Sequence, residues 1–386
     1  MLVVVTSLFG PAEFGEYAVA MSYVGIVSSI ACFRYELGIV SARSDVAAAN
    51  IVLASAVIAV VVAFLGYWLV VALIHWGSRI TLGGSPIVVA LLVFLKALDQ
   101  IAGSILYRRE AYFQFSVLKF VQAVILLIGF YLAGVAGAAA PGMLLATLVS
   151  YVAFALGGFV LVARYGSFRG IRVARIRSVL RSNQDFLKYS TPQTLIDNTL
   201  TNGINFVLVA FAGPAIVGHY NFMQRLLKAP LGLLFAAVSQ VLFRYCAKNQ
   251  DDLFLIRRTL AQTQRYVVSA LLAVLVAVFL AYTYFEVLPL PDQWGGLRMY
   301  MLSFAVWMLS PFLVSAFATL PVVYNKQREF FLVATSYNLV ALLVLSLMLR
   351  AGLVSAAFWT IGLTSILYYL GMNRWLLRIV DDRCQS

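Results

Sequence analysis

Charged residues inside apolar segments are the first feature of this chain that could do chemistry. Six of them interrupt long apolar runs: Lys96, Asp99, Lys119, Asp197, Arg225 and Lys228. A charge at the bilayer centre costs about 2.5–3.5 kcal/mol on insertion scales, so these side chains must pair, reach the surface or line a polar cavity. The six sum to a charge of +2. That balance suits a phosphate-bearing ligand, since basic side chains donate charge-assisted hydrogen bonds to phosphate oxygens.

Arg225 is the strongest ligand candidate among the six. It lies about ten residues into a helix that starts near Pro214, which is roughly 15 Å deep at 1.5 Å per residue. Lys228 follows on the same face, and Pro230 is a predicted kink. We expect Arg225 to contact an anionic headgroup. The alternative is an ion pair between Arg225 and Asp197, which has a similar predicted depth.

The remaining charges have structural alternatives. Lys96 and Asp99 are three residues apart and could pair with each other on one helix face. Lys119 is close to the end of its span and could extend to the membrane surface. Arg34 and Glu36 end another helix, where they form either a surface ion pair or a gate.

A polar stretch opens one span and must face away from lipid. Its polar residues are Ser190, Thr191, Gln193, Asp197, Asn198, Thr201 and Asn202. Asn198 and Asn202 are four apart and share a face, where they either bind sugar hydroxyls or hydrogen-bond neighbouring helices. Pro192 is a predicted hinge in this helix.

Composition requires that these residues are held by membrane helices. The chain has 386 residues, of which 63% are hydrophobic and 11% charged, against about 45–50% and about 25% in soluble domains. Apolar runs predict eleven full spans, at residues 17–33, 47–74, 86–107, 115–138, 142–163, 189–212, 220–243, 266–284, 300–323, 330–349 and 353–371. A twelfth element at residues 2–9 reaches about 12 Å, too short for a core of about 30 Å. The predicted fold class is an all-α, polytopic membrane protein of about twelve helices.

The basic residues are distributed very unevenly about these spans. The chain carries 28 Lys and Arg against 15 Asp and Glu, for a net charge of +13. If the first helix leaves the cytoplasm, 21 of the basic residues lie in cytoplasmic segments and three on the other face. By the positive-inside rule, both termini are cytoplasmic. Topology therefore explains most of the charge, and a nucleic-acid partner is not expected.

A short motif recurs in the two halves of the chain. Gly10-Pro11-Ala12 with Gly15 and Tyr17 matches Gly213-Pro214-Ala215 with Gly218 and Tyr220, at an offset of 203 residues. Each copy follows an apolar run and opens the next helix, as Gly and Pro at a tight turn would. Six crossings separate the copies, which predicts two parallel six-helix repeats, an arrangement typical of secondary transporters.

The repeat also predicts the domain organisation. We expect a six-helix bundle at 1–163, a basic cytoplasmic linker at 164–188, a second bundle at 189–373 and a tail at 374–386. The linker carries Val173, Ile176 and Leu180 among arginines, so it is either an amphipathic helix on the anionic leaflet or a solvated connection. Symmetry places the start of helix 1 about 14 residues before Met1, so we expect helix 1 to be truncated.

The motifs resemble those of bacterial polysaccharide transporters. They are Gly213-Pro214-Ala215-x-x-Gly218-x-Tyr220, Gln224-Arg225-Leu226, Pro230 and Ser239-Gln240-Val241-Leu242-Phe243, with Leu8-Phe9-Gly10-Pro11-Ala12-Glu13-Phe14-Gly15, Arg34-Tyr35-Glu36-Leu37 and Ser44-Asp45 in the first half. The resemblance, to Wzx-like O-antigen flippases of the multidrug/oligosaccharidyl-lipid/polysaccharide (MOP) exporter superfamily, covers nearly the whole chain. It implies two six-helix bundles in a MATE-like V around a central cavity.

The resemblance implies that an undecaprenyl-pyrophosphate-linked oligosaccharide is flipped to the periplasmic leaflet for O-antigen, capsule or exopolysaccharide synthesis. Its substrate contacts are expected at Arg225, Lys228, Lys96, Lys119, Asn198 and Asn202, and its coupling or gating residues at Asp197, Asp99, Arg34 and Glu36. The location is then the bacterial inner membrane, with membrane lipids and polysaccharide polymerase and chain-length proteins as partners. We expect no cofactor and no metal.

Two other function classes agree less well with these residues. A MATE-like multidrug antiporter would prefer an acidic cavity, whereas the charges inside the spans sum to +2. A membrane enzyme would need acid, base or metal groups on a sizeable loop. The only histidines, His75 and His219, are isolated at turns, where we expect them to be solvated, and Cys32, Cys246 and Cys384 show no metal-binding spacing. An enzyme is therefore not expected.

Overall fold

The fold is built from helices throughout the part of the chain that the structure describes. This computed structural model describes residues 2–42, 44–75, 83–165, 180–181, 183–248, 253–287, 290–323 and 326–382. The first helices are α1 (Leu2–Leu8), α2 (Pro11–Ser29), α3 (Glu36–Ser41), α4 (Asp45–His75), α5 (Pro86–Arg108), α6 (Tyr112–Val135) and α7 (Ala139–Tyr165). They are followed by η2 (Phe186–Ser190), α9 (Thr191–Ala212), α10 (Pro214–Lys248), α11 (Leu253–Thr283), η3 (Phe285–Val287) and η4 (Asp292–Trp294). The last are α12 (Leu297–Leu309), α13 (Phe312–Ser315), α14 (Leu320–Val323), α15 (Gln327–Arg350) and α16 (Val354–Asp382).

Ten of these segments are long and apolar enough to cross a membrane. Helix α2 has 19 residues, about 28 Å of helix, and carries Glu13 near its start. Helix α1 has seven residues, which confirms the predicted short first element. The all-α, polytopic prediction is confirmed, and the chain is a multi-pass membrane protein.

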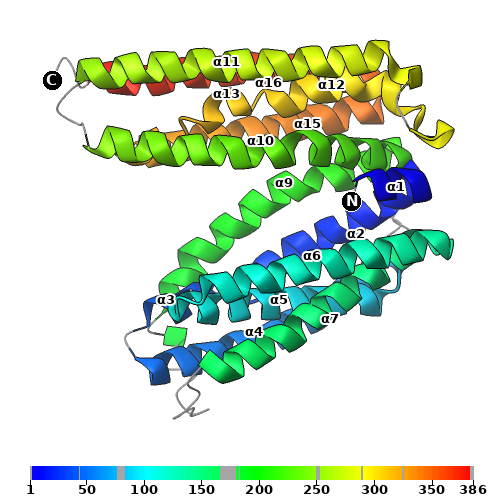
Figure 1. Cartoon of the computed structure of the whole chain (residues 1–386), viewed down its shortest axis with the longest axis vertical. Helices are drawn as coiled ribbons and strands as arrows, with labels where there is room; N and C mark the ends of the chain where they lie inside the picture. Colours follow the sequence, from blue (N-terminus) through cyan, green and yellow to red (C-terminus); the bar gives the residue numbers. More distant parts are fainter. Residues whose placement is uncertain are drawn as a thin grey trace. The chain divides into compact units, whose positions relative to one another are not determined.

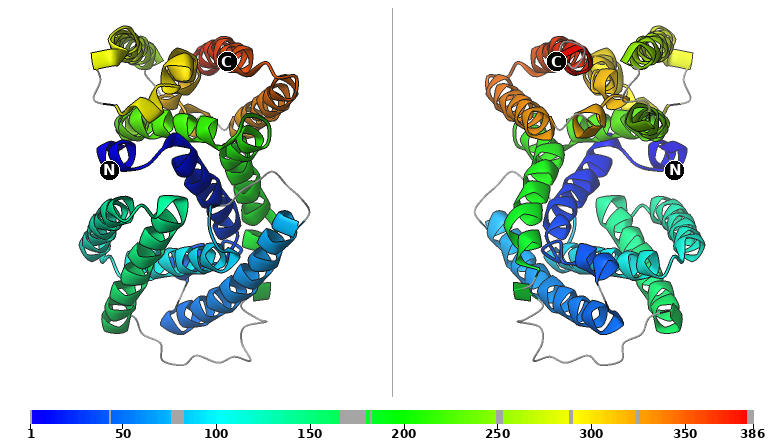
Figure 2. Two further views of the ribbon diagram at one scale, coloured as in Figure 1. Left: turned by 90° about the vertical axis from the view of Figure 1, so that its right-hand side faces the viewer. Right: turned by 90° about the vertical axis from the view of Figure 1, so that its left-hand side faces the viewer.

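The chain divides into two compact units, residues 3–218 and residues 219–386. In the first unit α5 packs against α4 and α7, α7 also packs along α6, and α2 packs along α9 (Figure 1). The side views show α6 and α7 next to each other at the edge of this unit (Figure 2). Helix α9, which is predicted to start the second bundle, packs along α2 and lies within residues 3–218. The predicted boundaries of the two six-helix bundles stay a prediction.

The second unit is built around α12 and α16, which pack along each other. Aromatic side chains fill the space between them: the Phe304 and Phe358 rings are 4.6 Å apart, and Tyr220 of α10 contacts Phe304 at 5.7 Å. These residues are buried. The apolar contacts fix α12 and α16 relative to the part of α10 that begins at His219.

The two copies of the repeat motif pack directly on each other within the first unit, which includes the first turn of α10. A Cβ atom added to Gly15 would lie 1.8 Å from the carbonyl oxygen of Pro214. A Cβ atom added to Gly218 would lie 1.8 Å from the carbonyl oxygen of Pro11. The contact is reciprocal, and only glycine allows the two backbones to approach this closely. Glycine is also favoured at position 213, because the φ of Gly213 is +89°, in the left-handed region.

Several local features differ from the expectation. The predicted span 300–323 is broken into α12, α13 and α14, and the short helix α3 was not predicted. Helix α10 runs through Pro230 as one helix. A π-helical turn, η2, precedes Pro192. The basic linker lies mostly outside the described residues.

Candidate functional site

Three charged side chains lie together between α5, α6 and α7. The Lys119 ammonium donates a hydrogen bond of 2.5 Å to Asp99 and lies 4.3 Å from the centre of the Phe154 ring. Lys96 has no carboxylate within ion-pair distance among the described residues. The alternative in which Lys96 pairs with Asp99 is therefore not the contact that forms, because Lys119 of the next helix binds the carboxylate.

This cluster keeps a net charge of +1. Lys119 does not reach to the membrane surface as the alternative predicted, because its ammonium turns inward to Asp99 and also donates to Gln122 at 3.3 Å. The Asp99 side chain is 13% exposed, against 37% for Lys119. The remaining cation, Lys96, is half-buried and available for an anion.

Arg225 and Lys228 lie one turn apart on α10, in the second unit. Both side chains are half-buried. Lys228 has no ion-pair partner among the described residues, whereas Arg225 makes contacts of its own. Asp197 is exposed on α9 and has no basic partner among the described residues of the first unit. Pairing of Arg225 with Asp197 stays a prediction.

The polar face of α9 contacts α2. The Asn205 amide donates a hydrogen bond of 2.6 Å to the Ser22 hydroxyl of α2, and both residues are buried. The Asn202 amide lies against Gly25 of α2, where an added Cβ atom would be 3.4 Å away. Helix–helix contact therefore accounts for part of this face. Sequence reasoning stopped at Asn202 and missed Asn205, although it continues the same face three residues later.

Asn198 and Asn202 also use their own helix. The Asn198 amide donates to the Thr194 carbonyl, and the Asn202 amide donates to the Asn198 carbonyl, each at 3.0 Å. Both side chains are half-buried. Their amide oxygens remain the groups through which they could accept a hydrogen bond from a sugar hydroxyl.

Arg34 and Glu36 form the predicted ion pair at the turn that joins α2 to α3. The Arg34 Nη1 atom lies 3.4 Å from Glu36 Oε1. Phe33 and Arg34 have φ angles of 47° and 60°, in the left-handed region that favours glycine. Glu36 is buried, and its Oε2 atom has no hydrogen-bond partner among the described residues. Burial raises the pKa of the Glu36 carboxyl above its ordinary value, and Arg34 offsets this in part.

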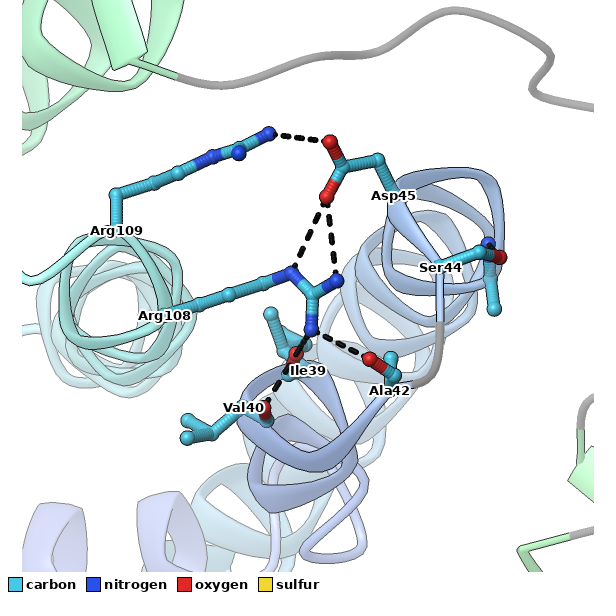
Figure 3. A network of polar contacts seen from close by, with 8 residues as sticks. Ile39, Val40, Ala42, Ser44, Asp45, Arg108 and Arg109 are labelled. Carbon is cyan, nitrogen blue, oxygen red and sulfur yellow. Dashed lines mark hydrogen bonds and ion pairs between the residues drawn. The ribbon is translucent and has the colours of Figure 1, made fainter.

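A fourth charged cluster was not predicted as a unit (Figure 3). Asp45, at the start of α4, accepts hydrogen bonds from Arg108 at 3.1 Å and from Arg109 at 2.8 Å. The same Arg108 guanidinium donates to the carbonyls of Ile39, Val40 and Ala42, the last at 2.6 Å. Because a helix end leaves its last carbonyls without partners, Arg108 acts as the cap of α3. In the sequence, this cluster is marked only by Ser44-Asp45, which we identified as part of the family motif and not as a partner of Arg108.

His219 departs from the expectation of a solvated side chain. It is 5% exposed, and its ring contacts the Trp294 ring at 5.8 Å and the Tyr300 ring at 6.5 Å. Neither ring nitrogen has a hydrogen-bond partner within the described residues. His219 is therefore covered by the segment around η4, which the spacing of apolar runs did not reveal.

No group of three or more metal-ligating side chains occurs among the described residues. The charged side chains described above are instead spread over four places: the α5–α6–α7 cluster, the Arg34–Glu36 turn, the Asp45–Arg108–Arg109 cluster and the Arg225–Lys228 turn of α10. In each place the basic side chains equal or outnumber the acidic ones. Such places can bind or release an anion, and no arrangement for covalent chemistry is evident in them.

Comparisons with known proteins agree with this reading. Residues 4–297 match a family described as polysaccharide biosynthesis protein. No curated protein matches the sequence. Among solved structures, the chain is similar to an inward-facing multidrug resistance MATE family transporter of the MOP superfamily, with a TM-score of 0.73, 14% identity, and 99% of this chain and 94% of that chain covered. It is also similar to the lipid II flippase MurJ in an inward closed conformation, with a TM-score of 0.70, 14% identity, and 98% and 86% covered.

Proposed function

The chain belongs to the polysaccharide biosynthesis protein family, within the MOP superfamily, and from this premise we propose that it flips a lipid-linked oligosaccharide. The substrate class is an undecaprenyl-pyrophosphate-linked repeat unit for surface polysaccharide, moved from the cytoplasmic to the periplasmic leaflet by alternating access. The observation that carries the proposal is the excess of positive charge held inside spans by a member of this family. The pyrophosphate is a charged part that every such substrate carries.

Arg225 and Lys228 are the proposed pyrophosphate contacts. A guanidinium donates parallel hydrogen bonds to phosphate oxygens, and an ammonium one turn away neutralises a further charge. Lys96 and Lys119 are proposed secondary contacts, with Asp99 holding Lys119 in place. Asn198 and Asn202 are proposed sugar contacts. Asp197, Asp99 and the Arg34–Glu36 pair are proposed to couple or gate the movement.

The family and the structural neighbours are transporters, and transport needs no catalytic group. The proposed location is the bacterial inner membrane with cytoplasmic termini, next to polysaccharide polymerase and chain-length proteins. A MATE-like multidrug antiporter remains the second candidate, on the likeness of fold alone. Resistance to cationic drugs in cells that express the chain would favour that candidate.

The test is a deletion strain that has no other flippase for the same repeat unit. We expect labelled lipid-linked repeat units to accumulate on the cytoplasmic side, and the wild-type chain to restore transfer. Arg225→Ala should lower the rate of transfer about tenfold or more, since a hydrogen bond to a charged group contributes about 1.5–3 kcal/mol. Arg225→Lys should retain more activity than Arg225→Ala.

A matched control removes the same charge from the end of the same helix. Arg244 lies on α10 and is exposed, so Arg244→Ala should leave the rate within a factor of two. Equal losses in Arg225→Ala and Arg244→Ala would assign the effect to overall charge and topology. Normal surface polysaccharide in the deletion strain would refute the flippase proposal itself.

A further inference from the structure

An apolar groove runs between α6 and α7 at the edge of the first unit. It has a volume of about 410 Å³ and is lined by Phe113, Gln114, Val117, Leu118, Val121, Gly157, Val160 and Leu161. Gln114 is the only lining residue with a polar side chain. Phe113 is 77% exposed and Val160 is 64% exposed. Because both helices cross the membrane, the groove opens toward lipid.

The groove lies within one leaflet. From Phe113 to Val121 is eight residues, about 12 Å of helix, which is less than half of a hydrocarbon core of about 30 Å. Its floor is set by Gly157, where an added Cβ atom would lie 2.5 Å from the Leu118 side chain. The close approach leaves a furrow flanked by Val117 and Val160. Such a furrow accommodates one hydrocarbon chain of the lipid in that leaflet.

The charged end of the groove is marked by Arg164. This residue is exposed and follows Leu161 by three, Val160 by four and Gly157 by seven positions, so it continues the groove face one turn farther along α7. Gln114, at the start of α6, lines the same end. A guanidinium has five donors, so Arg164 can hold phosphate oxygens in addition to the contacts that it already makes.

We propose that the α6–α7 groove is a binding site for an anionic phospholipid. One acyl chain occupies the apolar groove, and the phosphate is held by Arg164 at its polar end. The occupant is a resident lipid of the leaflet on the Arg164 side, separate from the lipid-linked oligosaccharide that the chain is proposed to transport. Charge complementarity and the single-leaflet length of the groove both favour this occupant.

The test is lipid retention by the purified full chain, measured by native mass spectrometry. The probes are dioleoyl phosphatidylglycerol and dioleoyl phosphatidylcholine, which differ only in the headgroup. Both lipids carry a phosphate, but the quaternary ammonium of phosphatidylcholine cancels its negative charge and repels the Arg164 guanidinium. We therefore expect wild type to retain phosphatidylglycerol about tenfold more than phosphatidylcholine. Arg164→Gln should bring phosphatidylglycerol down to the phosphatidylcholine level.

Blocking the groove separates the acyl-chain contact from the charge. Val160→Trp places a large ring in the groove and should lower retention of both lipids, and Val117→Trp should do so independently from α6. Both positions are exposed, so the larger side chain does not overpack the interior. Phe159→Trp is the matched control, because Phe159 is 73% exposed on the same helix and does not line the groove.

Three outcomes would overturn the proposal. The first is equal retention of the two lipids by wild type. The second is retention by Val160→Trp and Val117→Trp that equals retention by Phe159→Trp. The third is displacement of phosphatidylglycerol by an equal concentration of undecaprenyl pyrophosphate, which would assign the groove to the tail of the transported lipid. The first two results leave the flippase proposal unaffected, since it is tested by repeat-unit transfer.

Discussion

Replacing Gly15 by alanine tests the close contact between the two copies of the repeat motif. The new Cβ atom would lie 1.8 Å from the Pro214 carbonyl oxygen, whereas ordinary contact starts at 3.4 Å. The two backbones must therefore separate by about 1.6 Å. Neither atom belongs to a side chain that could rotate away. Overpacking costs about 1–3 kcal/mol where side chains can adjust, so we expect about 3 kcal/mol or more here.

The assay is thermal unfolding of the detergent-solubilised chain, followed by intrinsic fluorescence, together with repeat-unit transfer in the deletion strain. Gly203→Ala is the matched control, because Gly203 lies on α9 with nothing within 4 Å of an added Cβ atom. That variant should be neutral or more stable by up to about 1 kcal/mol, as expected for alanine in a helix. If Gly15→Ala and Gly203→Ala unfold at the same temperature, the close contact does not exist as described.

The reciprocal contact makes a sharper prediction for the double variant. Gly218→Ala should cost as much as Gly15→Ala, since its Cβ atom would lie equally close to the Pro11 carbonyl oxygen. The backbone separation that admits one methyl group also admits the other. The double variant should therefore lose clearly less than the sum of the single losses. Additive losses would show that the two glycines pack in independent places.

Three further predictions concern the charged clusters. Arg108→Ala should cost about 2–3 kcal/mol because three carbonyls lose the Arg108 donor and Asp45 keeps only Arg109. Arg109→Ala removes one partly exposed pair and should cost below about 1 kcal/mol, so similar unfolding temperatures of the two variants would contradict the capping role. Glu36→Gln should stabilise the chain at about pH 7 and not below pH 4.5. Burial raises the folded-state pKa of the Glu36 carboxyl, so its charged form opposes folding only above its ordinary pKa of 4.5. A gain in stability that does not depend on pH would refute this. Lys119→Met should cost about 3 kcal/mol, because it leaves Asp99 with only Lys96 nearby. Adding Asp99→Asn should restore most of the lost stability. A further drop in the unfolding temperature of the double variant would contradict the ion pair between Lys119 and Asp99.

The fold class was predictable from the sequence because it depends on apolar length and charge asymmetry, which are sums over many residues. The repeat was found for a similar reason: Gly15 and Gly218 are required by backbone contact and cannot be replaced without loss. The broken span after Leu309 was not predicted, because the hydropathy of residues 300–323 stays high across Pro311, the residue at which α12 gives way to α13. Hydropathy records apolar length and does not record where a helix breaks.

Partner choice inside the membrane was the least predictable part of the candidate site. Asp99 has one basic residue three positions away on its own helix and another twenty positions away on the next helix. Local spacing favoured Lys96, but the rotation of α6 relative to α5 determines which ammonium reaches the carboxylate. The cap formed by Arg108 depends in the same way on where the short helix α3 ends. Neither the rotation of α6 relative to α5 nor the end of α3 follows from the spacing of residues along one helix.

The Lys119–Asp99 pair has a consequence for how the chain enters the bilayer during synthesis. Helix α5 emerges first and carries Lys96 and Asp99, while Lys119 is still to come on α6. Each charge costs about 2.5–3.5 kcal/mol at the bilayer centre on its own. The pair can only form once α6 has joined α5, so the two helices are expected to leave the insertion machinery as a hairpin. The order of membrane insertion then depends on Asp99, whose charge is neutralised only after Lys119 of the following helix has entered the bilayer.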